Sequence, residues 1–381
     1  MFRLNEDALA IRDMARAFSA EKLAPHAIEW DEKKHFPVDV MREAAGLGMG
    51  GIYVKEDVGG SGLSRLDAAV IFEALSLGCP AVAAYISIHN MCAWMVDTYG
   101  NDEQRRKWLP ALVSMEKCAS YCLTEPGAGS DAAALSTRAV KDGDAYVLTG
   151  QKQFISGAGN ADDFYVVMAR TGGEGPKGIS TFVVEGGTPG LSFGANERKM
   201  GWNAQPTRAV IFDDCRVPAA NLIGKEGDGF RIAMSGLDGG RLNIAACSVG
   251  GAQAALDKAL AYTAERKAFG KKLNEFQALQ FRLADLAIEL EAARLFLYSA
   301  AAAYDRGDAE KTITIAMAKR FVTDTGFEVA NGALQLLGGY GYLCEYGIEK
   351  IVRDLRVHQI LEGTNEIMRL IVARALLARH T

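Results

Sequence analysis

The spacing of hydrophobic residues changes twice along the chain. From Glu6 to about Met115, apolar side chains recur at intervals of three and four residues, which is the period of an amphipathic helix. From about Cys118 the period becomes two, in short β-branched or aromatic runs separated by Gly, Asn and Asp. After Pro218 and Gly224 the helical spacing returns. The pattern therefore predicts a helical section, a section of strands, and a second helical section.

The expected elements follow from these periods. Strands are predicted over 120–123, 146–150, 164–168, 179–184 and 208–212, and long helices over 230–266, 276–305, 311–337 and 365–378. Because strands do not alternate with helices, a doubly wound sheet is disfavoured. We expect a mainly α protein with a central β domain, a small antiparallel sandwich or barrel between two helical layers. The predicted domains are 1–116, 117–225 and 226–381.

One uncharged stretch, residues 74–96, is long enough to cross a bilayer. Gly78 and Pro80 interrupt it, and Ser87, His89 and Asn90 lie in its second half. We therefore predict two buried helices here instead of a membrane span.

Composition narrows the class of protein. The 381 residues are 49% hydrophobic and 23% charged, which is typical of a folded globular chain, and the net charge of -5 gives no overall basic field for nucleic acid. Seven cysteines without a CxxC pair and five histidines without HExxH predict reduced thiols and no metal site. Arg3, Glu6 and Asp7 near the start do not fit a signal peptide, so we expect a cytoplasmic protein, or a matrix protein in a mature eukaryotic form.

Two polar loops follow predicted strands and are candidates for binding. In Thr124-Glu-Pro-Gly-Ala-Gly-Ser-Asp131, two glycines let backbone N–H groups converge on a diphosphate or an electron-rich ring edge. The same composition also suits an ordinary hairpin loop. In Phe154-Ile-Ser-Gly-Ala-Gly159, an aromatic face beside a hydroxyl suits a flat cofactor, although this loop alone is weak support.

Two further segments come before the last predicted helix. Gly338-Gly-Tyr-Gly-Tyr342 lacks GxGxxG spacing and a preceding strand, so we interpret it as a helix C-cap and interhelical turn. Thr364 is a predicted N-cap, and Glu362 lies just before it. The Glu362 carboxylate is either solvated near the helix dipole or, in an apolar pocket, a general base with a raised pKa. The pattern by itself leaves both open.

Taken in order, these segments resemble the acyl-CoA dehydrogenase family. The resemblance covers about residues 5 to 379 and rests on Tyr121-Cys-Leu-Thr-Glu-Pro-Gly-Ala-Gly-Ser-Asp131, Phe154-Ile-Ser156, Glu265-Arg-Lys-Ala-Phe-Gly270, Gln335-Leu-Leu-Gly-Gly339 and Glu362-Gly-Thr364. It implies an N-terminal helical domain, a middle antiparallel β domain and a C-terminal four-helix bundle, with FAD between the last two. It also implies a homotetramer built as a dimer of dimers.

The resemblance assigns a role to each matching position. It makes Glu362 the catalytic base. It implies that FAD is bound by Tyr121, Leu123, Thr124, Gly129, Ser130, Phe154, Ile155, Ser156, Arg266, Phe276, Gln277, Gln335, Leu336, Gly338, Gly339, Thr364, Asn365 and Glu366. It implies that an acyl-CoA substrate is bound by Ser130, Asp238, Arg241, Leu361, Gly363 and Arg374. The residues around Arg266 and Gln335 are expected to reach FAD partly from a neighbouring subunit.

Departures from the family's majority pattern indicate the substrate. Phe154 stands where many members have Trp, and Leu361 where many have Tyr. With the segments 85–94, 176–180, 201–206 and 357–362, they resemble the branch that oxidises short branched acyl-CoA esters such as isobutyryl-CoA. The implied reaction is α,β-dehydrogenation, with electron-transferring flavoprotein as acceptor. The alternatives are another short-chain dehydrogenase acting on 2-methylbutyryl- or butyryl-CoA, an oxidase or a flavin monooxygenase on the same scaffold, and a catalytically dead acyl-CoA binder.

Overall fold

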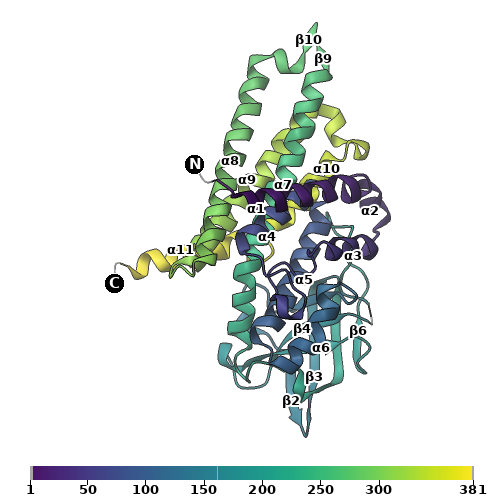
Figure 1. The fold of residues 1–381 in the computed structure, drawn as a ribbon, viewed down its shortest axis with the longest axis vertical. Coiled ribbons are helices and arrows are strands. Elements are labelled where there is room, and N and C mark those ends of the chain that lie inside the picture. The colour runs from purple at the N-terminus through teal and green to yellow at the C-terminus, as the bar shows by residue number, and fades with distance from the viewer. Residues whose placement is uncertain (1–2, 161, 380–381) are drawn as a thin grey trace.

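Helices precede and follow a β-sheet along the chain in the computed structural model, which describes residues 3–160 and 162–379, and the strands lie at the lower end of the molecule in Figure 1. The N-terminal helices are α1 Glu6–Phe18, α2 Ala27–Lys33, α3 Val38–Gly46, α4 Arg65–Ser76, α5 Pro80–Tyr99 and α6 Asp102–Val113, with a short π-helical turn at Ser19–Leu23. The Ser64 and Asn101 side chains cap α4 and α6 through reciprocal capping boxes. The uncharged stretch 74–96 covers the end of α4 and most of α5, and both helices are buried, as predicted. Within the described residues no helix has the length and apolarity needed to cross a membrane.

The strands are β1 Ala119–Cys122, β2 Arg138–Asp142, β3 Ala145–Ser156, β4 Phe164–Arg170, β5 Ile179–Glu185, β6 Leu191–Phe193, β7 Thr207–Pro218 and β8 Leu222–Ile223. They pair in the order β6-β7-β3-β2-β4-β5-β8, with β1 on β4. Most pairs are antiparallel, but β1 runs parallel to β4, and Arg138 pairs in parallel with Arg170. The sheet is therefore mixed: the expected antiparallel pairing is found in most strand pairs but not between β1 and β4. The chain leaves β1 through the hairpin of β2 and β3 and returns along the same direction in β4, and such a return gives a parallel pair.

The C-terminal helices form the upper part of the molecule in Figure 1. They are α7 Gly229–Glu265, α8 Gln277–Asp305, α9 Lys311–Leu337, α10 Ile348–Arg356 and α11 Asn365–Ala378, and the short hairpin of β9 Lys267–Ala268 and β10 Lys271–Lys272 joins α7 to α8. The four predicted long helices are confirmed to within one residue at each end. Helix α10 was not predicted, although Ile348, Ile351 and Leu355 form a buried stripe at helical spacing.

Helix α7 connects the two parts of the molecule. It begins beside β5, packs on α4 and α5, and continues alongside α9 and α8 to the β9–β10 tip (Figure 1). Six of its residues are glycine and all six are buried, among them Gly239, Gly240, Gly250 and Gly251, which lie against neighbouring elements. Gly in a helix costs roughly 1 kcal/mol relative to Ala, so close approach to α7 is the compensating gain. The segments around residue 362 lie against this helix.

Candidate active site

Glu362 lies in a turn between the 3₁₀ turn Val357–Gln359 and the N-terminus of α11. Its φ is 57° and that of Gly363 is 87°, so two successive residues are left-handed. For a residue other than glycine this conformation costs about 1–2 kcal/mol and requires support from its surroundings. Arg241 of α7 supplies part of that support, because its Nε donates to the Glu362 carbonyl oxygen at 3.0 Å.

The Glu362 carboxylate points at the surface of α7. A Cβ placed on Gly240 would come within 2.6 Å of Glu362 Oε2 and 2.9 Å of Oε1. Glu362 as a whole is partly exposed, but Oε2 is buried and has no hydrogen-bond partner within the described residues. The glycine at 240 is therefore what makes room for the carboxylate.

Burial sets the acidity of Glu362. Loss of solvent raises the pKa of this carboxyl to about 7, against the opposing effect of the Arg241 and Lys319 cations. Tyr121 on β1 and Cys92 on α5 lie close enough that their charges would interact with the Glu362 charge. Of the two interpretations of Glu362 that the sequence left open, the structure favours the carboxyl that is withdrawn from solvent and has a raised pKa.

Arg241 and Asp238 form a buried pair beside the turn. Arg241 Nη1 lies 2.8 Å from Asp238 Oδ1, and Thr312 donates to the other Asp238 oxygen at 2.8 Å. Leu361 and Gly363 flank the carboxylate in sequence and are partly buried. Arg374, by contrast, is exposed on α11, which projects from the body in Figure 1, and forms no hydrogen bond or ion pair within the described residues. The fold of one chain does not bring it to Glu362.

The polar loop after β1 is held at its base by a buried ion pair. Lys152 Nζ lies 2.7 Å from Glu125 Oε1 and 3.1 Å from the Leu123 carbonyl oxygen, and Lys152 is fully buried. Glu125 also accepts from the Ser136 and Thr137 N–H groups at 2.6 and 2.9 Å. Burial alone would raise the pKa of Glu125, but Lys152 and these donors lower it to about 2. Thr124, Gly129 and Ser130, which follow this anchor, remain partly or fully exposed.

The second candidate loop begins at a bulge in β3. The register between β3 and β7 shifts between Lys152 and Ile155, and Phe154 takes a φ of 60° there. The bulge turns the Phe154 ring outward, so that 64% of this side chain is exposed while Ile155 is buried. Ser156 ends the strand, and its carbonyl accepts from Ser120 of β1 at 2.9 Å. The exposed Phe154 ring therefore lies beside the loop after β1, where the Gln153 N–H donates to the Thr124 carbonyl oxygen at 2.8 Å. The cofactor contacts of Phe154 and Ser156 stay predictions.

The residues that follow Glu362 form the N-terminus of α11. The Thr364 side chain accepts from the Ile367 N–H, which confirms the predicted N-cap. Asn365 is buried, and its amide nitrogen donates to Asp324 at 2.6 Å and to Thr323 at 3.0 Å. Glu366 is exposed and forms an ion pair with Arg369 at 3.2 Å. The side chain of Asn365 is fully engaged with α9, so a cofactor contact from this residue would have to come from its backbone.

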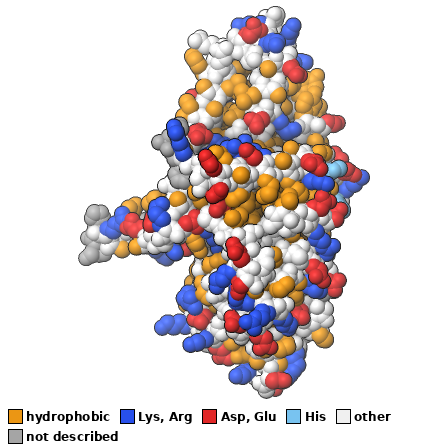
Figure 2. All heavy atoms as spheres, in the orientation of Figure 1, with side chains coloured by type: hydrophobic (Ala, Val, Ile, Leu, Met, Phe, Trp, Pro, Cys, Tyr) orange, Lys and Arg blue, Asp and Glu red, His pale blue; other side chains and the backbone are white. Residues whose placement is uncertain are grey.

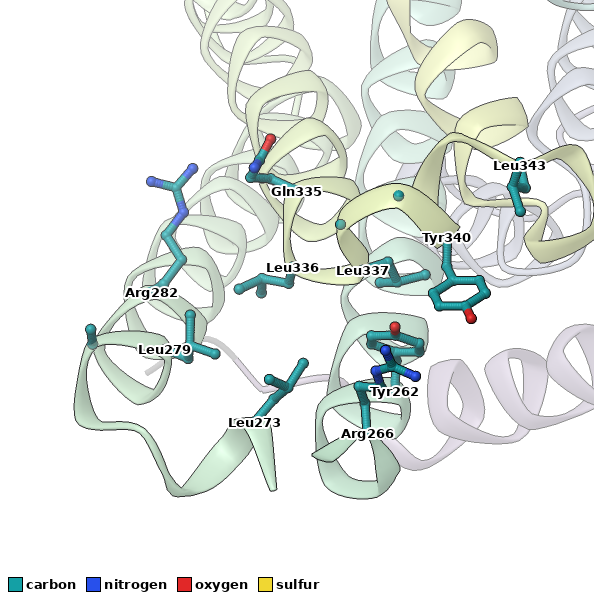
Figure 3. A pocket seen from close by; sticks show the side chains of 14 residues that line it. Tyr262, Arg266, Leu273, Leu279, Arg282, Gln335, Leu336, Leu337, Tyr340 and Leu343 are labelled. Atoms are coloured by element: carbon teal, nitrogen blue, oxygen red, sulfur yellow. The ribbon is translucent and has the colours of Figure 1, made fainter. Parts of the chain in front are cut away.

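The remaining predicted cofactor residues gather at the far end of α7, around a cavity of about 810 Å³ (Figure 3). Its lining includes Arg266, Gln335, Leu336, Gly338 and Gly339, and Phe276 and Gln277 begin the adjoining helix α8. Gly338 ends α9 with φ 58°, as expected of a C-cap. In Figure 3 the Tyr262 and Tyr340 rings lie beside the Arg266 guanidinium, and Arg266 is 5.4 Å from the Tyr340 ring centroid.

Four charged residues of the site and of the cavity were not predicted from the sequence. They are Glu125, Lys152, Lys319 and Arg282. Glu125 belongs to a quoted motif, but its partner is 27 residues away, and Lys152 alternates with polar neighbours in a strand, so nothing local distinguishes it from a solvated lysine. For metals, no group of three or more His, Cys, Asp or Glu side chains suited to a metal ion lies together in the described part of the chain.

Comparison of the chain with known protein families and proteins agrees with this three-part architecture. Family models match three consecutive parts: "Acyl-CoA dehydrogenase, N-terminal domain" over residues 5–116, "middle domain" over 120–215, and "C-terminal domain" over 227–377. Isobutyryl-CoA dehydrogenase, mitochondrial, of Dictyostelium discoideum is 59% identical over 98% of this chain and 90% of its own length.

Two solved structures have nearly the same backbone. Butyryl-CoA dehydrogenase from Megasphaera elsdenii superimposes with a TM-score of 0.95 at 39% identity, covering 99% of this chain and all of that one. A chain from a structural study of the electron transferring flavoprotein of Acidaminococcus fermentans gives 0.96 at 42% identity, covering 99% of both chains.

The Lys152–Glu125 pair generates a stability prediction. Lys152→Met should lower the free energy of unfolding by roughly 3–5 kcal/mol, because it leaves the buried Glu125 carboxylate without its cation. Chemical denaturation of Lys152→Met measures this loss, and Lys141→Met on the exposed strand β2 is the control. Adding Glu125→Gln to Lys152→Met should recover part of the stability. A Lys152→Met protein as stable as the Lys141→Met control would show that the pair does not anchor the loop.

Proposed function

Because the chain belongs to the acyl-CoA dehydrogenase family and is an oxidoreductase, we propose that it catalyses the α,β-dehydrogenation of isobutyryl-CoA to methacrylyl-CoA. The observation that carries this proposal is the partly exposed turn in which the Glu362 carboxylate faces Gly240 with one oxygen free of partners. A carboxyl with a pKa of about 7 is half ionised at neutral pH and suited to proton abstraction.

Glu362 is the general base of the proposed reaction. The α-proton of a thioester is very weakly acidic, so the site must also stabilise negative charge that develops on the carbonyl oxygen. The Glu362 N–H donates to no acceptor within the described residues, which leaves it available to that oxygen. Arg241 holds the Glu362 carbonyl oxygen, which belongs to the next peptide group, and so supports the left-handed turn that carries this N–H. One residue then serves as proton acceptor and as oxyanion donor.

The cofactor we propose is FAD, which when bound accepts the β-hydride of the substrate at N5. The residues present fit a flavin. The exposed Phe154 ring offers a stacking surface, Ser156 offers a hydroxyl, and a Cβ at Gly129 would meet nothing within 4 Å, so backbone there is open to a ligand. The Lys152–Glu125 anchor fixes the loop that carries Thr124 and Ser130.

We further propose that the enzyme is a homotetramer in which each FAD is bound by two chains. Arg241 and Arg266 are separated along α7 by roughly 37 Å at 1.5 Å per residue, farther than one dinucleotide spans. The cavity around Arg266 therefore serves a cofactor whose flavin lies on another chain. Large apolar side chains are also exposed in this region, including Phe269, Phe281, Ile288 and Tyr342. Figure 2 shows hydrophobic side chains on the surface of the upper helical part.

The preference for a short branched acyl group rests on sequence likeness and on one position. The 59% identity to an isobutyryl-CoA dehydrogenase exceeds the 39% identity to a butyryl-CoA dehydrogenase. Leu361 precedes the base and packs on the main core, so it bounds the region around the acyl α-carbon. Of the segment 85–94, Cys92 lies close enough to Glu362 for their charges to interact. The Trp94 ring centroid lies 4.9 Å from the guanidinium carbon of the buried Arg65. Tyr85 instead packs under Gly157.

We propose an electron-transferring flavoprotein as the acceptor of the reducing equivalents. The likeness to a chain from a study of such a flavoprotein supports this choice. The buried surroundings that raise the pKa of Glu362 also exclude water from the reacting atoms. The same dryness disfavours reaction with oxygen, which would make the enzyme an oxidase.

Glu362→Gln should keep bound flavin and acyl-CoA affinity but slow flavin reduction by about 10³-fold, because the amide accepts no proton. In the unsubstituted enzyme, kcat/KM should rise with pH through about 7, since the raised pKa keeps Glu362 protonated and inactive below that value. Anaerobic stopped-flow absorbance measures both. Near-normal reduction in Glu362→Gln would mean that another group is the base.

Flavin reduction should be fastest with isobutyryl-CoA or 2-methylbutyryl-CoA, slower with butyryl-CoA, and barely detectable with octanoyl-CoA. Each misplaced methylene costs only about 1–3 kcal/mol, so the preference over butyryl-CoA should be roughly tens to hundreds of fold. An anaerobic titration across these four esters measures the order. A maximum at octanoyl-CoA would overturn the branched-chain assignment while leaving the family unaffected.

Arg266→Ala should weaken FAD retention and lower the melting temperature in a way that added FAD restores, because ligand and interface are linked. Flavin content after gel filtration and thermal melts at several FAD concentrations measure these effects. Lys267→Ala, the next and equally exposed residue on β9, is the control. A fully flavinated monomer by light scattering would contradict the shared-cofactor arrangement.

A further inference from the structure

Lys319 is a buried lysine whose position the proposed reaction does not yet explain. It lies on α9 with no exposed surface. In the described part of the chain two other lysines are buried to a similar degree, and each has a carboxylate partner, Lys152 with Glu125 at 2.7 Å and Lys350 with Asp354 at 2.6 Å. Among the described residues Lys319 forms no ion pair within 4.0 Å and is bonded to neutral groups. Burial lowers the pKa of Lys319 to about 7, against the opposing effect of the Glu362 charge, so its charged form depends on the hydrogen bonds that it donates.

Those bonds go to the turn that carries Glu362. Lys319 Nζ donates to the Gly363 carbonyl oxygen at 2.8 Å and to Asn365 Oδ1 at 2.9 Å. Arg241 of α7 donates to the preceding carbonyl, that of Glu362, at 3.0 Å. Cations from two different helices thus hold the two carbonyls of one left-handed dipeptide.

We propose that Lys319 is a positioning residue for Glu362, which fixes the left-handed turn from the side of α9 so that the carboxylate faces Gly240. This inference rests on the proposed role of Glu362 as the base. Arg241 alone holds one carbonyl and leaves the Gly363 peptide free to rotate. With Lys319 in place, both peptides that flank the Gly363 α-carbon are fixed.

The partners of Lys319 are themselves held in place. Asn365, which accepts from Lys319, donates to Asp324 and Thr323 on the same helix α9. Gln359, at the start of the turn, donates to the same Asp324 oxygen at 2.8 Å. The segment from Gln359 to Asn365 is therefore attached to one face of α9 at both ends, and Lys319 is the contact at its centre.

Lys319 also acts on the charge of Glu362. The groups that face the carboxylate are Arg241 on α7, Lys319 on α9, Tyr121 on β1 and Cys92 on α5. Those whose charges reach Lys319 are Glu362, Arg241, Asp324, Glu366 and His358. Burial raises the pKa of Glu362 and the two cations oppose it, so removal of Lys319 moves that pKa further up. A role limited to folding would leave the pKa of Glu362 unchanged.

The test compares Lys319→Met, which removes both the bonds and the charge, with Lys319→Gln, which keeps a donor without the charge. Lys350→Met is the matched control, because it removes an equally buried lysine from the neighbourhood of Asp354 and Trp202. Rates are measured by anaerobic stopped flow with isobutyryl-CoA and expressed per bound flavin. Lys319→Met should slow flavin reduction on the order of 10²-fold, as a misplacement of about 1 Å does.

The pH profile separates positioning from stability. In Lys319→Met and Lys319→Gln, the midpoint of the rise in activity with pH, called here the rising limb, should shift to higher pH by about half a pH unit or more. Lys350→Met should lower the melting temperature without moving this limb. Either Lys319 variant, folded and flavinated, with an unchanged rate and an unchanged limb would overturn the proposal.

A crystal structure of whichever Lys319 variant folds gives a readout that needs no substrate. The proposal predicts that φ of Gly363 departs from its left-handed value and that the Glu362 carboxylate moves away from Gly240. An unaltered turn would overturn the positioning role. If the unsubstituted enzyme is reduced by none of the acyl-CoA esters, the proposed function fails, and this structural comparison still decides the role of Lys319.

Discussion

The chemistry of this chain depends on one strained turn being held against two helices. Glu362 and Gly363 are both left-handed, and the first has a side chain that disfavours this conformation. The turn persists because Arg241 and Lys319 bind its two carbonyl oxygens. It brings a carboxylate to the surface of α7, where Gly240 has no side chain to exclude it. The backbone conformation, the burial and the raised pKa of Glu362 therefore have one structural origin.

The second half of the site follows a different principle. The exposed loop after β1 and the bulged end of β3 present Thr124, Ser130, Phe154 and Ser156 outward, whereas the Lys152–Glu125 pair beneath them is buried. If the loop after β1 and the end of β3 were mobile, they would not keep a planar cofactor at a fixed distance from Glu362. Helix α7, which packs on both α5 and α9 and begins against β5, keeps the two halves in a fixed relation.

Much of the fold can be predicted from local sequence patterns. The long helices are encoded by three-and-four spacing within single segments, and Thr364 and Gly338 serve the capping roles that their residue types predict. What could not be predicted depends on pairing between distant segments. The parallel pairing of β1 with β4 brings together residues about 45 positions apart, and nothing within either strand specifies its partner. Helix α10 is an exception, because its stripe of Ile348, Ile351 and Leu355 was available in the sequence and was missed.

The same limit applies to the site. Glu362 stood out through its motif, but its environment depends on Gly240 and Arg241, more than 120 positions earlier. Lys319 and Lys152 look like solvated lysines, since lysine is rarely buried and each finds its partner elsewhere in the chain. Arg374 lies exposed on the projecting helix α11, and its predicted substrate contact stays a prediction.

The most direct test of the account transfers the carboxylate from residue 362 to residue 240 while keeping it in the same region of the site. Because the Gly240 α-carbon faces the Glu362 carboxylate, Gly240→Glu combined with Glu362→Gly places a carboxylate in the same region from the opposite wall. The rate of flavin reduction by isobutyryl-CoA is measured in this double variant and in Glu362→Gly alone. The account predicts that the double variant recovers part of the lost rate. A double variant that binds flavin and substrate but is reduced no faster than Glu362→Gly would contradict it.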